Sequence, residues 1–151
     1  MKKSIVLLSF ILLLNLLPIS VVEADTSFPD VFQYEQEISY LTNKNIIRGF
    51  PDGSFGPTKS LTRLQAVQML LKAKNITDIT APNPNFSDMT IGKYGYEEVA
   101  KAVELGIISG KTAKDGTKYF DPTSPLTRGQ MAKIMVESGN LPLKKTPYFT
   151  D

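Results

Sequence analysis

Two short segments of the sequence combine a hydroxyl, a guanidinium and an amide at the same spacing. They consist of Thr62, Arg63 and Gln65 in the first segment and of Thr127, Arg128 and Gln130 in the second. A threonine followed three residues later by a glutamine is the capping-box pattern that begins a helix. An arginine in the first helical turn can hold a carboxylate with two parallel hydrogen bonds, next to backbone N–H groups and a favourable helix dipole. The chemistry that both segments predict is recognition of an anion.

Each of these residues also has a purely structural interpretation. The two arginines could be solvated first-turn residues or partners in surface ion pairs. Because they occupy equivalent places in two copies of one pattern, we favour ligand contact for them. The threonines and glutamines are explained as caps without any ligand, and capping is the role that we expect to dominate.

Catalytic chemistry has little support in the composition. The chain has no histidine and no cysteine, which excludes Ser-His-Asp and Cys-His catalysis and histidine-based metal sites. Carboxylate pairs remain, but Asp115 and Asp121 lie in turn sequence, and Glu97 and Glu98 are adjacent. The Asp52-Gly53-Ser54 turn lacks the oxygen-ligand series of a calcium loop. We therefore expect no enzyme activity, no catalytic residue, no metal and no cofactor.

The N-terminal 24 residues are typical of a secretory signal peptide. Lys2 and Lys3 precede an apolar run from Ile5 to Leu17, and Val22-Glu23-Ala24 offers small residues before a cleavage site. The run is shorter than the roughly 20 residues that span a membrane, although an uncleaved anchor is the alternative. We expect cleavage after Ala24 and no membrane association afterwards.

Removal of residues 1–24 leaves a chain that is almost neutral. Two lysines and one glutamate are lost, so 17 basic and 15 acidic residues become 15 and 14, a net charge of +1. A nucleic-acid partner normally requires a clustered basic face, so we expect none. An exported chain without cysteine must gain its stability from packing.

The chain contains an internal repeat. Ile46 to Leu71 returns imperfectly at Ile107 to Met135, and the opening Phe28-Pro29-Asp30 returns 58 residues later as Phe86-Ser87-Asp88. The last three residues repeat this opening once more. We expect a signal peptide at 1–24, a first repeat at 25–75, a linker at 76–85, a second repeat at 86–140, and the start of a truncated third repeat at 141–151.

Hydrophobic spacing predicts two helices in each repeat. In the first helix of the chain, apolar side chains share one face, namely Val31, Tyr34, Ile38 and Leu41. The corresponding face of the second repeat consists of Tyr96, Val99, Ala102, Val103 and Leu105. Asn45 and Gly106 stand where these helices should end, because both tolerate positive φ. The later helices should run from Thr62 to about Lys74 and from Thr127 to about Gly139, which predicts an all-α fold.

These motifs together resemble the S-layer homology (SLH) repeat of bacterial cell-surface proteins. The resemblance lies in the aromatic-x-Asp opening, Ile46 to Gly49, the loop from Phe50 to Pro57, and Leu61-Thr62-Arg63-x-Gln65. It implies helical units that usually occur in threes and form a pseudo-threefold spindle. The grooves between the units hold secondary cell-wall polysaccharide, which often carries a pyruvate ketal. Two repeats would form an incomplete spindle.

The resemblance also implies which residues bind the polysaccharide. Carried onto this sequence, they are Thr62, Arg63, Gln65, Thr127, Arg128, Gln130, Gly49, Phe50, Gly110, Asp30 and Asp88. For Asp30 and Asp88 we favour capping of the first helices, and for the two glycines a role in backbone geometry. The sequence departs from the family where glutamine replaces glutamate after the arginine, and where Lys111 stands in place of Phe50.

The implied function is non-covalent anchoring of an exported protein to the bacterial cell wall. The partner would be secondary cell-wall polysaccharide, and the location the cell wall and cell surface. One alternative is a surface-layer assembly module that completes its spindle with another SLH-containing chain. Another is the truncated anchor of a larger surface enzyme.

Overall fold

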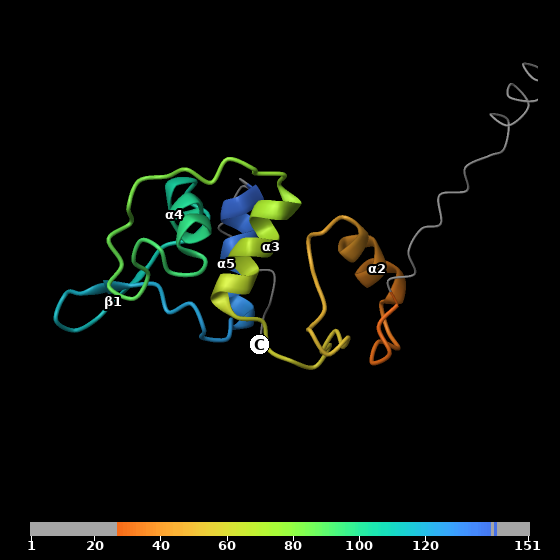
Figure 1. The fold of residues 1–151 in the computed structure, drawn as a ribbon. Coiled ribbons are helices and arrows are strands. Elements are labelled where there is room, and N and C mark those ends of the chain that lie inside the picture. Colours follow the sequence, from red (N-terminus) through yellow and green to blue (C-terminus); the bar gives the residue numbers. More distant parts are fainter. Residues whose placement is uncertain (1–26, 140, 142–151) are drawn as a thin grey trace, which may run out of the picture.

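The structure is a computed structural model that describes residues 27–139 and 141. The predicted signal peptide lies outside these residues, as does the predicted third-repeat segment apart from Leu141. The regular secondary structure of the described chain is mostly helical, in agreement with the predicted fold class (Figure 1). Its helices are α2 (Glu35–Asn43), α3 (Arg63–Ala73), α4 (Tyr96–Glu104) and α5 (Arg128–Gly139).

A small antiparallel ribbon was not predicted. Strand β1 (Lys111–Thr112) pairs with β2 (Lys118–Tyr119) inside the loop that is longer in the second copy. At its tip the Asp115 carboxylate accepts a hydrogen bond from the Thr117 N–H at 2.9 Å, and Gly116 has a φ of 86°. The extra residues therefore fold as a short hairpin at the surface, where an insertion disturbs little packing.

Local signals correctly placed the starts of α3 and α5 and the ends of α2 and α4. The Thr62 hydroxyl accepts from the Gln65 N–H at 3.2 Å, while the Gln65 side chain accepts from the Thr62 N–H at 2.9 Å. Thr127 and Gln130 form the same reciprocal pair at 3.2 and 3.1 Å. Asn45 and Gly106 both have positive φ after α2 and α4, so the two predicted terminators are confirmed.

The predicted apolar face of the first helix is wrong at its beginning. Helix α2 starts at Glu35, and Tyr34 before it is left-handed with 72% of its surface exposed. Val31 is buried, but it precedes the helix. Leu105 is also exposed rather than part of the face of α4. Spacing alone could not show that the chain bends between Val31 and Glu35.

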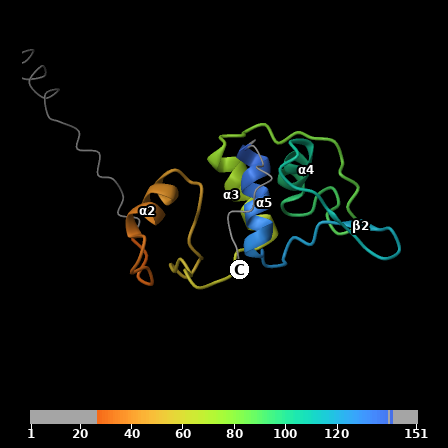
Figure 2. The same ribbon diagram turned by 180° about the vertical axis from the view of Figure 1, so that it is seen from behind.

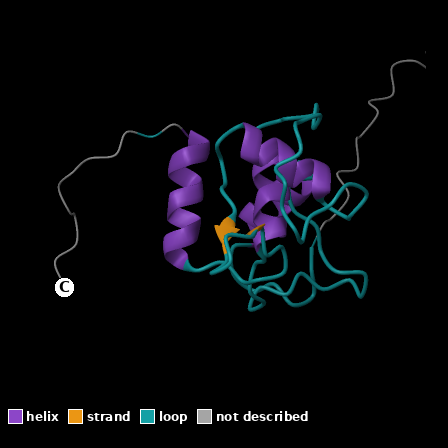
Figure 3. Ribbon diagram, turned by 90° about the vertical axis from the view of Figure 1, so that its left-hand side faces the viewer, coloured by secondary structure: helices purple, strands orange, loops and turns teal. Residues whose placement is uncertain are grey.

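The main core lies between α3, α4, α5 and the chain around Phe120. Val67 and Leu71 of α3 pack with Val99 and Ala102 of α4, and Phe120 is fully buried among them. Helix α5 contributes Ile134 to this cluster. Seen from the side, most of the loop chain gathers below the helices, around the ribbon (Figure 3). We call residues 61–139 the helical body.

The first part of the described chain forms a separate lobe, residues 27–60. Helix α2 stands apart from the other three helices in both the front and the back view (Figures 1 and 2). No residue of α2 is buried. The lobe has its own small cluster, in which Val31 and Ile47 are buried and the rings of Phe28 and Phe55 lie 5.3 Å apart. No described helix combines the length and apolarity needed to cross a membrane.

Candidate functional site

An aspartate in each repeat opening clamps a loop in the same way. Asp30 accepts hydrogen bonds from the N–H groups of Phe55 and Gly56, both at 2.8 Å. Asp88 accepts from Phe120 and Asp121, at 2.7 and 2.6 Å. The expectation that these aspartates cap the first helices is therefore wrong, because α2 and α4 begin without a side-chain cap. The two backbone N–H groups lower the pKa of Asp30, since they stabilise its charged form.

The glycine of each loop lies against the aromatic ring of the same opening. A Cβ added at Gly49 would collide with the ring of Phe28, and one at Gly110 with the ring of Phe86. Neither glycine has positive φ. Their predicted role in backbone geometry therefore takes the form of close approach, in which the loop backbone packs directly on the ring.

Arg63 has a structural role that the sequence did not reveal. Its side chain is 8% exposed and crosses into the second repeat, where Nε donates to the Phe120 carbonyl at 2.9 Å. Its Nη2 donates to the Ser109 carbonyl at 3.2 Å, and the guanidinium carbon lies 4.8 Å from the Phe120 ring centroid. The side-chain donors of Arg63 are therefore used within the fold, whereas the sequence favoured ligand contact for this residue.

Burial and charge act in opposite directions on this arginine. Burial lowers the pKa of Arg63, while the carboxylates of Asp121 and Asp88 oppose that shift. An arginine keeps its proton throughout, so the guanidinium remains a cation inside the fold. The pKa of Asp121 is itself lowered, first by its contact with Lys111 at 2.6 Å and then by the Ser124 hydroxyl.

The N-terminus of α3 does not offer free N–H groups to an anion. The N–H of Arg63 donates to the Ser124 carbonyl, and that of Leu64 to the Pro122 carbonyl, both at 3.0 Å. The Gln65 N–H is taken by the Thr62 hydroxyl. The anion site that we expected at this helix start is therefore filled by the chain that leads into α5.

The equivalent end of α5 is free among the described residues. Arg128 is exposed, and neither its side chain nor its N–H has a partner in residues 27–139. Thr127 and Gln130 cap the helix as their counterparts do. The two predicted arginines thus occupy equivalent sequence positions but very different environments.

A groove of about 670 Å³ lies between the lobe and the helical body. The first loop supplies one wall with Arg48, Gly49, Phe50 and Lys59, among others. Helix α3 supplies the face that carries Gln65, Gln68, Met69 and Lys72. Tyr94, two residues before α4, and Glu98 in the first turn of α4 close the groove. We call this cavity the inter-lobe groove.

The inter-lobe groove carries excess positive charge. Three of its lining residues are cations, Arg48, Lys59 and Lys72, and one is a carboxylate, Glu98, which leaves a net charge of +2. Among the described residues no carboxylate forms an ion pair with these three cations. Glu98 accepts from the Gln68 side chain at 3.1 Å. The groove can therefore attract an anionic ligand.

Aromatic rings also face the inter-lobe groove. Phe50 is 36% exposed, and the Lys59 ammonium lies 3.7 Å from its ring centroid. Such a distance places the cation within range of the ring face. Across the groove the Tyr94 hydroxyl accepts a hydrogen bond from Gln68 at 3.3 Å. Cations, amides and aromatic surface in one groove suit a sugar that carries acidic groups.

Only three of the predicted site residues line this groove, namely Gly49, Phe50 and Gln65. Thr62 and Asp30 do not line the groove but hydrogen-bond to residues that do, and Arg63 lies beside them in α3. The predicted residues of the second repeat are not among the lining residues. Prediction missed Arg48, Lys59, Lys72, Tyr94 and Glu98. Lys72 could have been found, because it follows Gln65 and Gln68 at helical spacing on one face. The α4 residues carry no such local signal.

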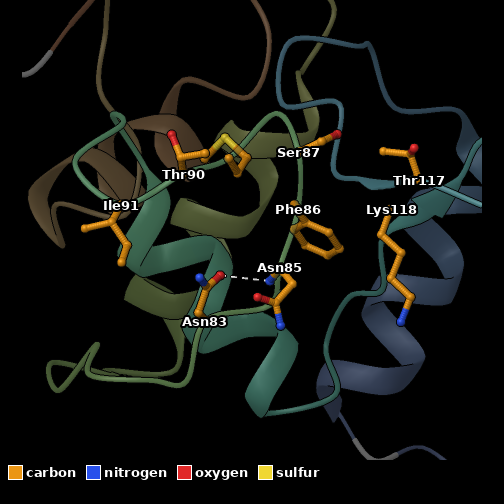
Figure 4. Close-up of a pocket in the computed structure, with 9 residues that line it drawn as sticks. Asn83, Asn85, Phe86, Ser87, Thr90, Ile91, Thr117 and Lys118 are labelled. Atoms are coloured by element: carbon orange, nitrogen blue, oxygen red, sulfur yellow. Dashed lines mark hydrogen bonds between the residues drawn. The ribbon is translucent and has the colours of Figure 1, made fainter.

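A second cavity of about 510 Å³ lies on the second repeat (Figure 4). Its lining combines polar side chains with the apolar Phe86, Met89 and Ile91, and Lys118 is the one charged residue among the lining residues. The Asn83 side chain accepts from the Asn85 N–H at 2.8 Å along its edge. None of the predicted site residues lines it, so the inter-lobe groove is the stronger candidate.

Comparison with known families identifies the repeat. The family model of the S-layer homology domain matches residues 27–67 and again residues 85–132. The chain belongs to the S-layer homology family. The SLH domain anchors surface proteins to the cell wall, which places this chain at the bacterial cell surface. The resemblance carried by the sequence motifs is confirmed.

Similar proteins include both surface-layer proteins and enzymes. The chain is 32% identical to S-layer protein EA1 of Bacillus anthracis over 124 residues, 80% of this chain and 14% of the relative. It is 31% identical to exoglucanase XynX of Acetivibrio thermocellus over 129 residues, 84% of this chain and 11% of the relative. Against the amylopullulanase of Thermoanaerobacterium thermosulfurigenes the identity is 30%, covering 77% of this chain and 6% of the relative. The SLH chain thus spans a small part of each relative.

Proposed function

We propose that this SLH chain anchors an exported protein to the cell wall by holding an anionic secondary cell-wall polysaccharide in the inter-lobe groove. The observation that supports it most directly is the set of three cations in that groove without ion pairs among the described residues. Arg48 can form two parallel hydrogen bonds to a carboxylate, whereas Lys59 and Lys72 act as point charges. Phe50 and Tyr94 add surface for a sugar ring.

A pyruvate ketal would strengthen this recognition. It adds one carboxylate to a sugar that otherwise offers hydroxyl groups, and the carboxylate would lie among the groove cations. Gln65 and Gly49 line the same groove and belong to the residues that we assign to the site. Arg63, Thr62 and Asp30 are assigned to positioning, because their polar groups are already engaged within the fold.

The remaining predicted residues belong to a second groove in this proposal. Thr127, Arg128, Gln130, Gly110 and Asp88 stand in the second repeat where their counterparts stand in the first. The inter-lobe groove needs the start of α4 as its third wall. A second groove would need the corresponding helix of a further repeat, as a pseudo-threefold spindle would provide.

Retention on cell wall tests the proposal. Purified wall should retain the chain, and wall stripped of polysaccharide by hydrofluoric acid should not. The double variant Arg48→Ala/Lys72→Ala should lose roughly tenfold in retention, since it removes two of the groove charges. The control Lys44→Ala/Lys114→Ala removes the same charge from exposed positions outside the groove and should bind normally. Equal retention on stripped wall would refute the proposal.

We also propose that residues 1–24 are removed on export and that the mature repeats occupy 25–75 and 86–140. The chain could equally serve a larger surface protein, because it matches enzymes such as exoglucanase XynX over only 11% of their length. In both cases the chain itself performs anchoring rather than catalysis. Mass spectrometry of the exported protein would test the cleavage site after Ala24.

A further inference from the structure

The cavity on the second repeat is built partly by the two segments in which the repeats differ. The linker 76–85 supplies Asn83 and Asn85, and the hairpin of β1 and β2 supplies Thr117 and Lys118. The first loop is shorter and forms no strand in the described structure. This cavity therefore has walls that the first repeat does not provide, and none of its lining residues belongs to the inter-lobe groove.

Hydrogen bonds hold the walls of this cavity in place. The Ser87 N–H donates to the Lys118 carbonyl at 2.9 Å, which fastens the hairpin to the opening of the repeat. The Asn83 side chain accepts from the Asn85 N–H at 2.8 Å, and Asn85 has a φ of 57°, which asparagine tolerates. Pro84 between them has a fixed φ. The shape of the cavity is thus set by the chain itself.

The surface of the cavity combines an apolar floor with polar groups at its rim. Phe86 and Met89 are 6% and 1% exposed, whereas Ile91 is 75% exposed at the edge. Around them stand the Asn85 carboxamide and the Lys118 ammonium, which have no hydrogen-bond or ion-pair partner in the described part of the chain (Figure 4). The amide offers a donor and an acceptor, and the ammonium offers three donors.

This combination suits one sugar unit with an acidic group. The C–H face of a sugar ring can lie on Ile91, its hydroxyl groups can bond to Asn85, and Lys118 can pair with the acid. The volume of about 510 Å³ lies within the range of small-ligand sites. Because most of the lining residues are exposed, the ligand can continue beyond the cavity, as a polymer does.

The cavity and the inter-lobe groove share one short loop as their border. Ile91 lines the cavity and Tyr94 lines the groove, and the two side chains are 75% and 78% exposed. Three residue steps span at most about 11 Å even in a fully extended chain. A polymer that leaves the groove past Tyr94 can therefore reach Ile91 within a few sugar units.

We propose that the cavity on the second repeat is a second subsite for the anionic polysaccharide, holding a sugar farther along the polymer that occupies the inter-lobe groove. Lys118 pairs with its acidic group, and Asn85 binds its hydroxyl groups. This inference rests on the proposed function, because it takes the same polysaccharide as its ligand. Two contacts on one polymer reinforce each other through effective concentration, so long chains bind more tightly than short ones.

Binding of long and short polysaccharide tests the subsite. The probes are polysaccharide released from purified wall by hydrofluoric acid and its shortest hydrolysed fraction that still binds the unmodified chain. Lys118→Glu should weaken binding of the released polysaccharide about tenfold and leave the short fraction unchanged. Lys114→Glu is the matched control, exposed on the same hairpin but outside the cavity, and should bind both normally. Arg48→Ala/Lys72→Ala should weaken both.

The outcomes separate this inference from the proposed function. If Lys118→Glu binds the long polysaccharide as well as Lys114→Glu does, the subsite is overturned, while a loss in Arg48→Ala/Lys72→Ala still supports the groove. Equal losses by Lys118→Glu on long and short probes would also overturn it, because the cavity would then not extend the groove. Normal binding by Arg48→Ala/Lys72→Ala would refute the groove and, with it, the subsite.

Nuclear magnetic resonance gives a readout at the cavity itself. The side-chain amide signals of Asn85 should shift or broaden when the long polysaccharide is added to the labelled chain, and stay in place with the short fraction. The side-chain amide signals of Asn43, at the end of α2 and outside both cavities, are the control. Asn85 signals that respond no more than those of Asn43 would overturn the subsite.

Discussion

The Nε of Arg63 lies 2.9 Å from the carbonyl oxygen of Phe120, which joins the start of α3 to the core of the second repeat. This bond links residues 57 positions apart, and the ring of Phe120 is itself fully buried. The Arg63 guanidinium donates hydrogen bonds to loop carbonyls inside the fold. Arg63 belongs to α3, which forms one wall of the inter-lobe groove, so these bonds link that wall to the core. The same residue pair therefore bears on stability and on site geometry.

Removing this arginine should destabilise the fold. Arg63→Ala leaves the carbonyls of Ser109 and Phe120 without their donor and opens space beside the ring, so we expect a loss of about 3 kcal/mol in the free energy of unfolding. Urea denaturation followed by circular dichroism measures it. Arg128→Ala is the matched control, and its exposed position predicts a change below about 0.5 kcal/mol. Equal losses would contradict the structural role of Arg63.

Replacement by alanine should lower the stability of the fold at the loop glycine Gly110 and raise it at the helical glycine Gly129. In Gly110→Ala the new methyl group meets the buried ring of Phe86, so we expect a loss of about 1–3 kcal/mol in unfolding free energy. Gly129→Ala in the first turn of α5 meets nothing within 4 Å and should gain about 0.5 kcal/mol through higher helix propensity. Thermal unfolding of both variants tests this, and equal melting temperatures would count against the close contact.

Sequence reasoning succeeded where partners are near in the chain. The capping boxes join residues three positions apart, and the terminators Asn45 and Gly106 act through their own φ angles, so both could be predicted. Asp30 and Arg63 could not, because their partners lie 25 to 57 residues away and are backbone groups without a sequence signature. For the same reason prediction found Gly49, Phe50 and Gln65 of the inter-lobe groove but missed Tyr94 and Glu98, which come from the other repeat.

The free energy of unfolding should fall in acid, because the Asp30 carboxylate holds the first loop by hydrogen bonds. The folded-state pKa of Asp30 lies below its ordinary value of 3.8, so the carboxylate contributes stability above that value. The contribution is lost as the pH falls below 3.8 through the lowered pKa, when the proton displaces the hydrogen bonds from Phe55 and Gly56. Unfolding free energies from pH 6 to pH 2 measure this. Asp30→Asn should be less stable near neutral pH and show a shallower decline; an unchanged slope would argue against the clamp.

Salt should weaken binding of the chain to cell wall if the cations of the inter-lobe groove attract the polysaccharide. Arg48, Lys59 and Lys72 are exposed, and exposed charges are screened at a Debye length of about 3 Å in 1 M salt compared with about 10 Å in 0.1 M. We expect retention on purified wall to fall several-fold over that range. The Arg48→Ala/Lys72→Ala variant should respond less to salt than the Lys44→Ala/Lys114→Ala control, and parallel responses would show that the groove is not responsible.

Phe50 should matter for binding more than for folding. Its ring is partly exposed in the inter-lobe groove, where it lies under the Lys59 ammonium. Phe50→Ala removes apolar surface from the ligand side and frees Lys59 from its place, so we expect wall retention to fall several-fold, with a loss of less than about 1 kcal/mol in stability. Tyr40→Ala on α2 is the control, since it removes an aromatic ring that is 61% exposed and outside the groove. Retention that falls equally in both variants would mean that aromatic exposure in general, rather than Phe50 in the groove, governs binding.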